Sequence, residues 1–422
     1  MRRQIDNLID YTKMTLNLEN YILRRHQIYK RDNLFNEISY TLSMEWFPEH
    51  LIDWDDPELN PDGAAIIEIN IHTRKFVSIV FVGEKSFVKQ PLLQQVAKEQ
   101  VIQWIEQETE LIYGEKFRLK QSTENEYLFI ATWKDIRVYP PASIEVKFDH
   151  SNRLVFYSNQ GYFPESSQII QEKYRLTLAQ VEELSFQQLK LINFPNNDSQ
   201  SLHPLYAIEE IFVTNNGFET ISYEPVTDEH QIVEVNKVIK WKTPLQDMFV
   251  AGNLTLTSEV SVEEALAEDR PKRLINITPV VQDRTFHAVK SLLRQKYPDE
   301  SGEWRLQLLY QENNYLVAVV RQTDETNLVF KRKLTVFIDQ NTFEVVNLVD
   351  NKVMLDTFKN YTQAGSPKVT PAEAYERLKE HLTLEPVYVF DQSTGKYILC
   401  GKLDCQYGVD AITGKVIRLD EL

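Results

Sequence analysis

Short segments in which apolar and polar residues alternate recur along the chain, and each is followed by a polar turn. In the last one, apolar residues stand at Tyr407 and Val409, Asp410 opens the turn, Gly414 closes it and apolar residues resume at Val416. Alternation at every second residue predicts a strand with one buried face, and two such segments around a short turn predict a β-hairpin. The same pattern occurs at residues 66–76, 144–154 and 334–345.

The turn residues themselves support the hairpin prediction. An Asp carboxylate can accept hydrogen bonds from backbone N–H groups two or three residues further on, and Gly414 can adopt the positive φ that closes such a loop. At the position of Gly414 the earlier segments have Arg74, Arg153 and Phe343. Because a Phe does not readily adopt positive φ, the sequence predicts that the earlier turns differ in type from the last one. The turn at Asp149 is also one residue shorter.

Apolar residues at helical spacing predict a helix before each group of strands. The first helix is expected to begin near the N-terminus and to reach about Arg25. Thr177 and Thr370 each begin a capping box, and Pro371 suits the first position of the helix that follows Thr370. Further helices are predicted at residues 93–114, 261–264 and 286–297.

Two pairs of short segments repeat at one spacing. Residues 114–115 and 126–128 resemble residues 302–303 and 314–316, with an offset of 188 residues in both cases. A constant offset over such a length is typical of duplicated units. The sequence therefore predicts an α+β fold built from repeated units, in each of which a helix covers one face of an antiparallel sheet. We expect equivalent hairpins at Asp149, Asp339 and Asp410.

Composition narrows the class of protein. The chain has 62 acidic and 46 basic residues and a net charge of −16, which disfavours nucleic acid or an anionic membrane as the main partner. Only 12 of the 422 residues are glycine, which argues against glycine-rich phosphate loops and cofactor cradles. Tyr and Phe are frequent, as antiparallel sheets prefer.

The sequence also leads to an expectation about location. Asp6, Asp10 and Lys13 interrupt the first thirty residues, so that no apolar run of signal-peptide length occurs there. No segment approaches the roughly 20 apolar residues of a membrane span. Two cysteines cannot form a disulfide framework, as is usual in a reducing compartment. We therefore expect a cytoplasmic protein.

The C-terminal residues resemble a known family. The helix start at residues 369–375, the strand at residues 396–399 and the ending at residues 409–416 look like a PepSY-type unit of the YcdB/YcdC repeat proteins of Gram-positive bacteria. The resemblance covers the last fifty residues and, less completely, residues 286–346, and before residue 250 it rests on the hairpins. It implies a helix on a small antiparallel sheet and a protein- or peptide-binding or scaffold module, with regulation of a peptidase as one role. It implies no catalytic residues.

The chain is too long for a single ordinary core, so several units are expected, in two halves that divide near residue 250. The predicted units are 1–88 (a helix and a hairpin), 89–165 (PepSY-like), 166–250 (a helix and hairpins), 251–366 (a linker and a PepSY-like unit) and 367–422 (PepSY-like).

Candidate chemistry is sparse, and the sequence assigns no catalytic, cofactor-binding or metal-ligating residue. Cys400 and Cys405 flank Lys402, which could lower a thiol pKa, and it stays open whether the two sulfurs lie close across a short turn. Buried, reduced and unreactive thiols are the favoured interpretation. The acidic segment 53–58 lacks the Gly and distal Glu of a calcium loop. No close pairing typical of a metal site occurs among His26, His72, His203, His230, His287 and His381.

Two functions follow as hypotheses. The first is a non-enzymatic module that binds a peptide or a protein through an open sheet edge or through the face of a sheet that no helix covers. The alternative is a hydrolase whose carboxylates converge in a cleft between the two halves. A shallow polar face would favour the first, and clustered acids with raised pKa in a deep cleft the second.

Overall fold

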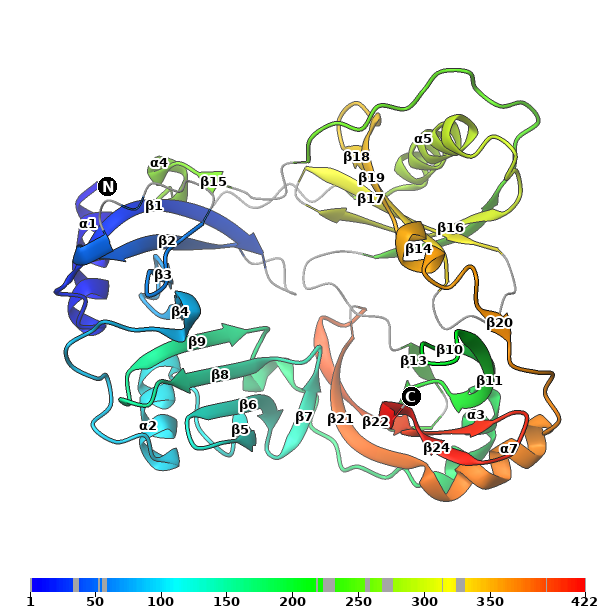
Figure 1. Ribbon diagram of the computed structural model, residues 1–422, viewed down its shortest axis with the longest axis horizontal. Helices are drawn as coiled ribbons and strands as arrows, with labels where there is room; N and C mark the ends of the chain where they lie inside the picture. The colour runs from blue at the N-terminus through cyan, green and yellow to red at the C-terminus, as the bar shows by residue number, and fades with distance from the viewer. Residues whose placement is uncertain are drawn as a thin grey trace.

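The computed structural model describes residues 2–32, 38–51, 54, 59–217, 219–222, 232–254, 259–267, 276–312, 314–323, 331–391 and 393–421. It is a mixed α+β structure in which antiparallel sheets dominate and helices are few, which confirms the predicted fold class (Figure 1).

The first unit is a helix followed by an antiparallel meander. It contains α1 (Arg2–Thr15), β1 (Tyr21–Asp32), β2 (Ile38–Pro48), β3 (Ala65–Asn70) and β4 (Phe76–Phe81). The expectation that the first helix reaches Arg25 is wrong. Asn17 adopts a φ of 55°, and the Leu18 N–H donates to the Lys13 carbonyl, so the helix ends there in a left-handed cap. From Tyr21 onward the chain pairs with β2 as a strand.

The second unit repeats this order. It contains α2 (Lys98–Thr109), β5 (Phe117–Ser122), β6 (Glu126–Trp133), β7 (Ile136–Tyr139), β8 (Ser143–Phe148) and β9 (Leu154–Gln160). The last strands of the two units pair with each other, with Ile79 opposite Tyr157. Buried residues of both units form one hydrophobic core, to which Ile5, Leu8, Val101 and Ile105 contribute from the two helices. The predicted boundary at residue 88 therefore does not separate two cores.

A third group of strands forms its own sheet, which we call the α5 unit. It contains β14 (Val233–Ile239), α5 (Pro279–Lys296), β16 (Trp304–Glu312), β17 (Tyr315–Gln322), β18 (Lys333–Asp339) and β19 (Val345–Asp350), with the strands in that order in the sheet. Because β14 belongs to this sheet, the α5 unit crosses the predicted boundary at residue 250. The short strand β15 (Glu259–Val260) instead pairs with β1, beside α4 (Val262–Ala265).

The C-terminal part of the structure contains two sheets, each interleaved from the same two distant segments. One segment supplies α3 (Glu182–Gln187), β10 (Leu189–Asn196), β11 (Ser201–Ile208), β12 (Ile211–Thr214) and β13 (Thr220–Ser222). The other supplies α7 (Pro371–Leu378), β21 (Thr383–Asp391), β22 (Lys396–Asp404), β23 (Tyr407–Asp410) and β24 (Val416–Arg418), and α6 (Lys352–Asp356) and β20 (Thr362–Gln363) lead into it. β11 pairs with β23 in a sheet with the strand order β10-β11-β23-β24. β12 pairs with β22 in a separate sheet with the order β13-β12-β22-β21, which we call the C-terminal sheet. Both segments share one core. The predicted units 166–250 and 367–422 thus fold together.

The predicted capping boxes are confirmed, whereas α2 begins five residues after the predicted start at residue 93 and α5 begins seven residues before the predicted start at residue 286. Thr370 caps α7 in a capping box with Glu373, and Thr177 forms a capping box with Gln180 before a 3₁₀ turn and α3. Gly217 has a φ of 79° in the turn between β12 and β13. The hairpins at Asp149, Asp339 and Asp410 each connect the third and fourth strands that follow the helix of their unit, when β7 is not counted, as does the turn at residue 70.

The prediction that the earlier turns differ in type is wrong for two of them. Arg74 and Phe343 have φ values of 58° and 63°, and Gly414 has 78°. In each case this residue donates its N–H to the carbonyl of the residue that opens the turn, four positions earlier. The opener's side chain accepts two further N–H groups in each turn, and these bonds hold the chain in a conformation that the Phe side chain alone disfavours. The turn at Asp149 is one residue shorter, as predicted, with Asn152 at 59°.

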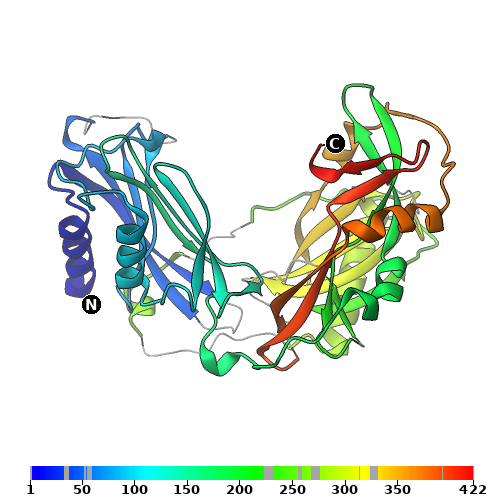
Figure 2. The same ribbon diagram turned by 90° about the horizontal axis from the view of Figure 1, so that it is seen from below.

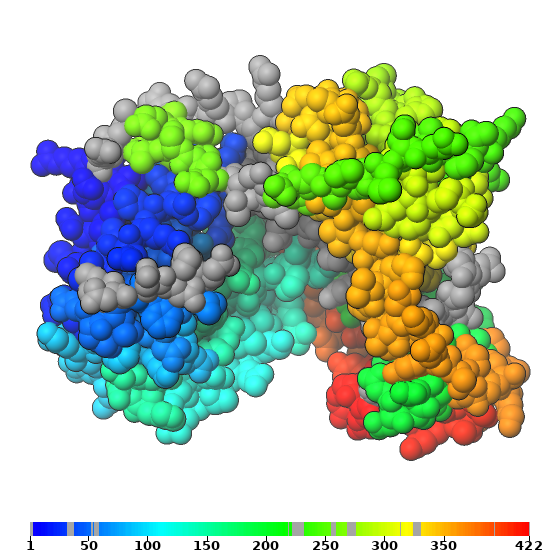
Figure 3. All heavy atoms as spheres, turned by 45° about the horizontal axis from the view of Figure 1, so that its top comes forward, coloured from blue at the N-terminus to red at the C-terminus, as the bar shows by residue number. Residues whose placement is uncertain are grey.

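The helices of the N-terminal units lie on one side of their common sheet. In the view from below, α1 and α2 lie together on the outer side, and the C-terminal half lies across from them (Figure 2). The space-filling view shows that a hollow separates the two halves over part of their length (Figure 3). Within the part of the chain that the structure describes, no helix lies on the opposite face of the N-terminal sheet.

Candidate functional site

The N-terminal and C-terminal sheets join at one short parallel pairing, which we call the seam. β7 pairs with β21 there, with Arg137 opposite Val387 and Tyr139 opposite Val389, and the two sheets become one sheet of 14 described strands. A separate hydrophobic cluster lies at the seam and includes Trp133, Val138, Tyr388, Tyr397 and Leu399. Segments about 250 residues apart in sequence are therefore adjacent in the structure.

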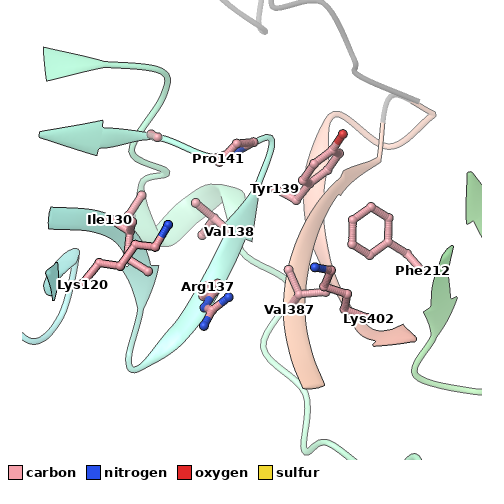
Figure 4. A pocket seen from close by; sticks show the side chains of 11 residues that line it. Lys120, Ile130, Arg137, Val138, Tyr139, Pro141, Phe212, Val387 and Lys402 are labelled. Carbon is pink, nitrogen blue, oxygen red and sulfur yellow. The ribbon is translucent and has the colours of Figure 1, made fainter. Parts of the chain in front are cut away.

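A pocket of about 240 Å³ opens at the seam. Its apolar lining comes from both sides of the seam, as Figure 4 shows, with Val138 from β7, Val387 from β21 and Phe212 from β12. The rings of Tyr139 and Phe212 are 4.7 Å apart between centroids and make one wall. The remaining lining residues are Lys120, Ile130, Ala131, Arg137, Pro141, Ala142 and Lys402.

Three cationic side chains surround this apolar lining, and they differ in how well they are neutralised. No carboxylate of the described residues lies within ion-pair distance of Lys120. The Arg137 guanidinium is 4.0 Å from the Glu385 carboxylate, and both side chains are exposed, so the pair is weak. Two cations therefore remain accessible at the rim. None of the lining residues is acidic, so the pocket offers no carboxylate pair for the hydrolase hypothesis.

The third cation, Lys402, is held by two carboxylates. Its Nζ lies 3.1 Å from Glu210 and 3.3 Å from Asp404. Burial opposes the charge of Lys402, but the two carboxylates outweigh that effect and raise its pKa. Burial also raises the pKa of Glu210, whose bond to Lys402 acts in the opposite direction. Lys402 is therefore committed to internal ion pairs, and Lys120 and Arg137 are the groups that a bound anion could reach.

The helix-free face of the N-terminal sheet adjoins the pocket. Across it, Ile66, Val80 and Phe156 stand opposite one another on β3, β4 and β9, and each is half-buried. Their sequence neighbours Ile67, Ile79 and Tyr157 point into the core beneath the helices. The face therefore presents an apolar row rather than a purely polar surface.

Charged groups bound this apolar row at both ends. Glu45 is opposite Ile66 and is 2.7 Å from Arg25, and Lys147 is opposite Phe156 and lies 3.3 Å from Glu145. The Lys147 ammonium also lies 5.7 Å from the centroid of the Phe156 ring. Ile130, on β6 of the same face, lines the seam pocket, so the row and the pocket are parts of one surface.

The structure separates the two cysteines that the sequence brought forward. No turn lies between them, because β22 continues to Asp404, and a run of five extended residues places their Cα atoms on the order of 15 Å apart. Cys400 packs in one hydrophobic cluster and Cys405 in another, and neither forms a disulfide. Burial raises the pKa of Cys400 to about 12 and also raises that of Cys405. Both thiols are thus protonated and unreactive at neutral pH.

The other predicted candidates have ordinary surroundings or lie outside the description. His381 stacks on Tyr407 at 4.2 Å, and His287 lies 3.5 Å from Asp283 on its own helix. The described residues contain no group of three His, Cys, Asp or Glu side chains that could hold a metal ion. His230 and all of the acidic segment 53–58 except Trp54 lie outside the described residues.

One buried carboxylate was missed by the sequence reasoning. Glu108 of α2 accepts the backbone N–H of Phe76 at 2.6 Å and so joins the second unit to the first. Burial raises its pKa, and the bond from Phe76 and the nearby Lys75 only partly offset this. A signal was present, because Glu108 continues the apolar spacing of Val101 and Ile105. The residues of the seam pocket gave no such signal, since distant segments supply them.

Comparisons with known proteins give a distant likeness. No family model and no curated protein matches the chain. Among the described residues, no helix is long and apolar enough to cross a membrane. Among solved structures, the C-terminal domain of Bacillus megaterium YpeB is similar, with 10% sequence identity, a TM-score of 0.25 and coverage of 82% of this chain and 96% of that one.

Proposed function

We propose that the protein is a non-enzymatic module that binds a peptide or a protein segment on the helix-free face of its N-terminal sheet. The observation that supports the proposal is the row Ile66, Val80 and Phe156, which leaves apolar side chains partly exposed on an open face between charged ends. When a partner covers apolar surface that folding left exposed, removal of that surface from water favours binding.

The dimensions of the face suit an extended peptide. Strands lie about 4.8 Å apart, so the five side chains from Glu45 to Lys147 span about 19 Å. An extended peptide of about six residues covers that length. Apolar side chains of the peptide would pack on the row, and charged ones would meet Arg25 or Lys147 at its ends. If the bound segment belongs to a peptidase, binding would serve the peptidase-regulating role that the family resemblance implies.

A peptide-library selection followed by fluorescence polarisation tests this proposal. Val80→Arg places a long charged side chain in the middle of the row and should weaken binding of selected peptides at least tenfold. Gln103→Arg introduces the same charged side chain on the exposed side of α2, behind the sheet, and should leave binding unchanged. Circular dichroism verifies that both variants fold. Equal affinities for the wild type and Val80→Arg would overturn the proposal.

A further inference from the structure

We propose that the seam pocket binds the C-terminal carboxylate of a peptide whose last side chain is apolar. This inference rests on the proposed function and names the end of the ligand that the surface recognises. It combines three features of the pocket: its size, its apolar lining and the two accessible cations at its rim.

The size of the pocket limits the ligand. Its volume of about 240 Å³ is below the roughly 300–1,000 Å³ of sites for drug-sized ligands and cofactors. At about 30 Å³ per water-sized group, it holds on the order of eight non-hydrogen atoms. One Leu- or Phe-sized residue with its terminal carboxylate approaches that size. A larger ligand must extend out of the pocket.

The pocket offers different surroundings to the side chain and to the carboxylate of such a residue. Val138, Val387 and the tilted rings of Tyr139 and Phe212 offer apolar surface to a side chain. Lys120 and Arg137 enter from the β5 and β7 side, as Figure 4 shows. An Arg guanidinium binds a carboxylate through two parallel hydrogen bonds, and a neighbouring Lys adds a second positive charge.

The surrounding ion pairs decide where the carboxylate lies. Lys402 is neutralised by Glu210 and Asp404, so it attracts an anion less than the other two cations do. Glu385, 4.0 Å from Arg137, is the group that an incoming carboxylate must displace. Removal of the Glu385 charge should therefore strengthen binding, which a purely structural role of Arg137 would not produce.

The position of the pocket explains why the ligand is a peptide. Ile130 belongs both to the pocket and to the helix-free face. In the register of β6 and β8, Ile130 is opposite Ser143 and lies four residues, about 13 Å, along the strand from Glu126, which is opposite Lys147 at the end of the row. A peptide whose last residue fills the pocket must therefore run obliquely across the strands to lay its preceding residues on Ile66, Val80 and Phe156. A free short-chain carboxylate would fill the pocket alone and gain nothing from that face.

The test compares two peptides that differ only at the C-terminus. Dansyl-Gly-Ala-Ala-Leu with a free carboxylate and the same peptide as its amide are titrated with the full chain by fluorescence anisotropy. We expect the acid to bind at least tenfold more tightly. Lys120→Gln and Arg137→Gln should each weaken binding of the acid about fivefold or more and leave that of the amide unchanged. Glu385→Gln should strengthen binding of the acid.

A lysine far from the pocket provides the matched control. Lys190→Gln removes an exposed strand lysine from β10 and should change neither affinity. Failure of the wild type to prefer the acid overturns the inference, and so does competition by hexanoate at the same concentration as the peptide, which would assign the pocket to free carboxylic acids. If library-selected peptides still lose affinity in Val80→Arg, the proposed function stands without this inference. If the selected peptides bind Val80→Arg as tightly as the wild type, the proposed function is wrong, whatever the result at the pocket.

Discussion

The hairpins at Asp339 and Asp410 have the same turn conformation, but the residue with positive φ that closes the turn is a bulky Phe in one and a Gly in the other. Phe343 closes one turn and Gly414 the other, at φ values of 63° and 78°, and each donates its N–H to the opening aspartate's carbonyl. Positive φ is nearly free for glycine and costs a bulky residue about 1–3 kcal/mol. The comparison shows that the opener's hydrogen bonds, rather than the glycine, set the conformation of the turn.

A helix arginine contacts each turn, but in different ways. Arg377 of α7 donates to the Gly414 carbonyl, and a side chain at Gly414 would collide with that guanidinium. Arg284 of α5 lies 3.8 Å above the centre of the Phe343 ring. Where glycine leaves space, the arginine binds the backbone. Where Phe fills that space, the arginine stacks on the ring, which offsets part of the strain.

The largest effect is expected from a side chain at Gly414. Gly414→Val adds backbone strain and displaces Arg377, and should lower the free energy of unfolding by about 2–4 kcal/mol. Gly395 is a matched control, because it closes the turn between β21 and β22 at φ 65° with no atom within 4 Å of an added Cβ. Gly395→Val should cost only the strain, about 1–2 kcal/mol. Hydrogen exchange of residues 407–418 and 388–400 measures the two losses, and equal losses would show that Arg377 does not restrict the turn.

Removal of a turn opener should have the next largest effect. The Asp410 carboxylate accepts the N–H groups of Ile412 and Thr413, both at 2.8 Å. Asp410→Ala leaves these groups without that acceptor and should cost about 0.5–2 kcal/mol, as loss of a comparable cap does. Urea denaturation measures the loss in the free energy of unfolding, and hydrogen exchange in β23 and β24 locates it. An unchanged stability would mean that the backbone bonds alone hold the turn.

The stacking of Arg284 on Phe343 should contribute less. A double-mutant cycle with Arg284→Gln, Phe343→Leu and both together isolates the coupling, which we expect to be about 0.5–1 kcal/mol. Hydrogen exchange in β16 to β19 follows unfolding of the α5 unit, against whose core Phe343 packs. Additive losses would show that Phe343 occupies its strained position without help from the arginine.

The smallest effect is a dependence on pH. Hydrogen bonds from the backbone of Thr342 and Asn341 lower the pKa of Asp339 below its usual value. Stability from this carboxylate is therefore present above the unfolded-state pKa of about 3.9 and is lost as pH falls through the folded-state value. Asp339→Asn, which copies the opener Asn70, should remove that part of the acid sensitivity. Thermal midpoints between pH 7 and 2 test this, and parallel curves for the two proteins would contradict it.

Much of the local structure could be predicted because it depends on neighbours in sequence. The capping box at Thr370 and the hairpins at Asp149, Asp339 and Asp410 lie where the residue patterns predicted them. The type of the earlier turns was predicted wrongly because a glycine is not required at the positive-φ position: Arg74 and Phe343 adopt it as well. Thr73, Thr342 and Thr413 stand three residues after their openers and accept the N–H two residues further on, and this shared threonine was the better signal.

The sequence by itself determined the strands, the helix caps and the α+β class, because hydrogen bonds within a few residues and the period of apolar side chains specify them. Only the tertiary structure decided that β4 pairs with β9, that β11 and β12 interleave with β22 and β23, and that β7 meets β21 at the seam. Sheet edges pair through backbone groups that every residue carries, so side-chain patterns do not identify the partner. The seam pocket depends on such a pairing, and for that reason its residues could not be predicted from the sequence.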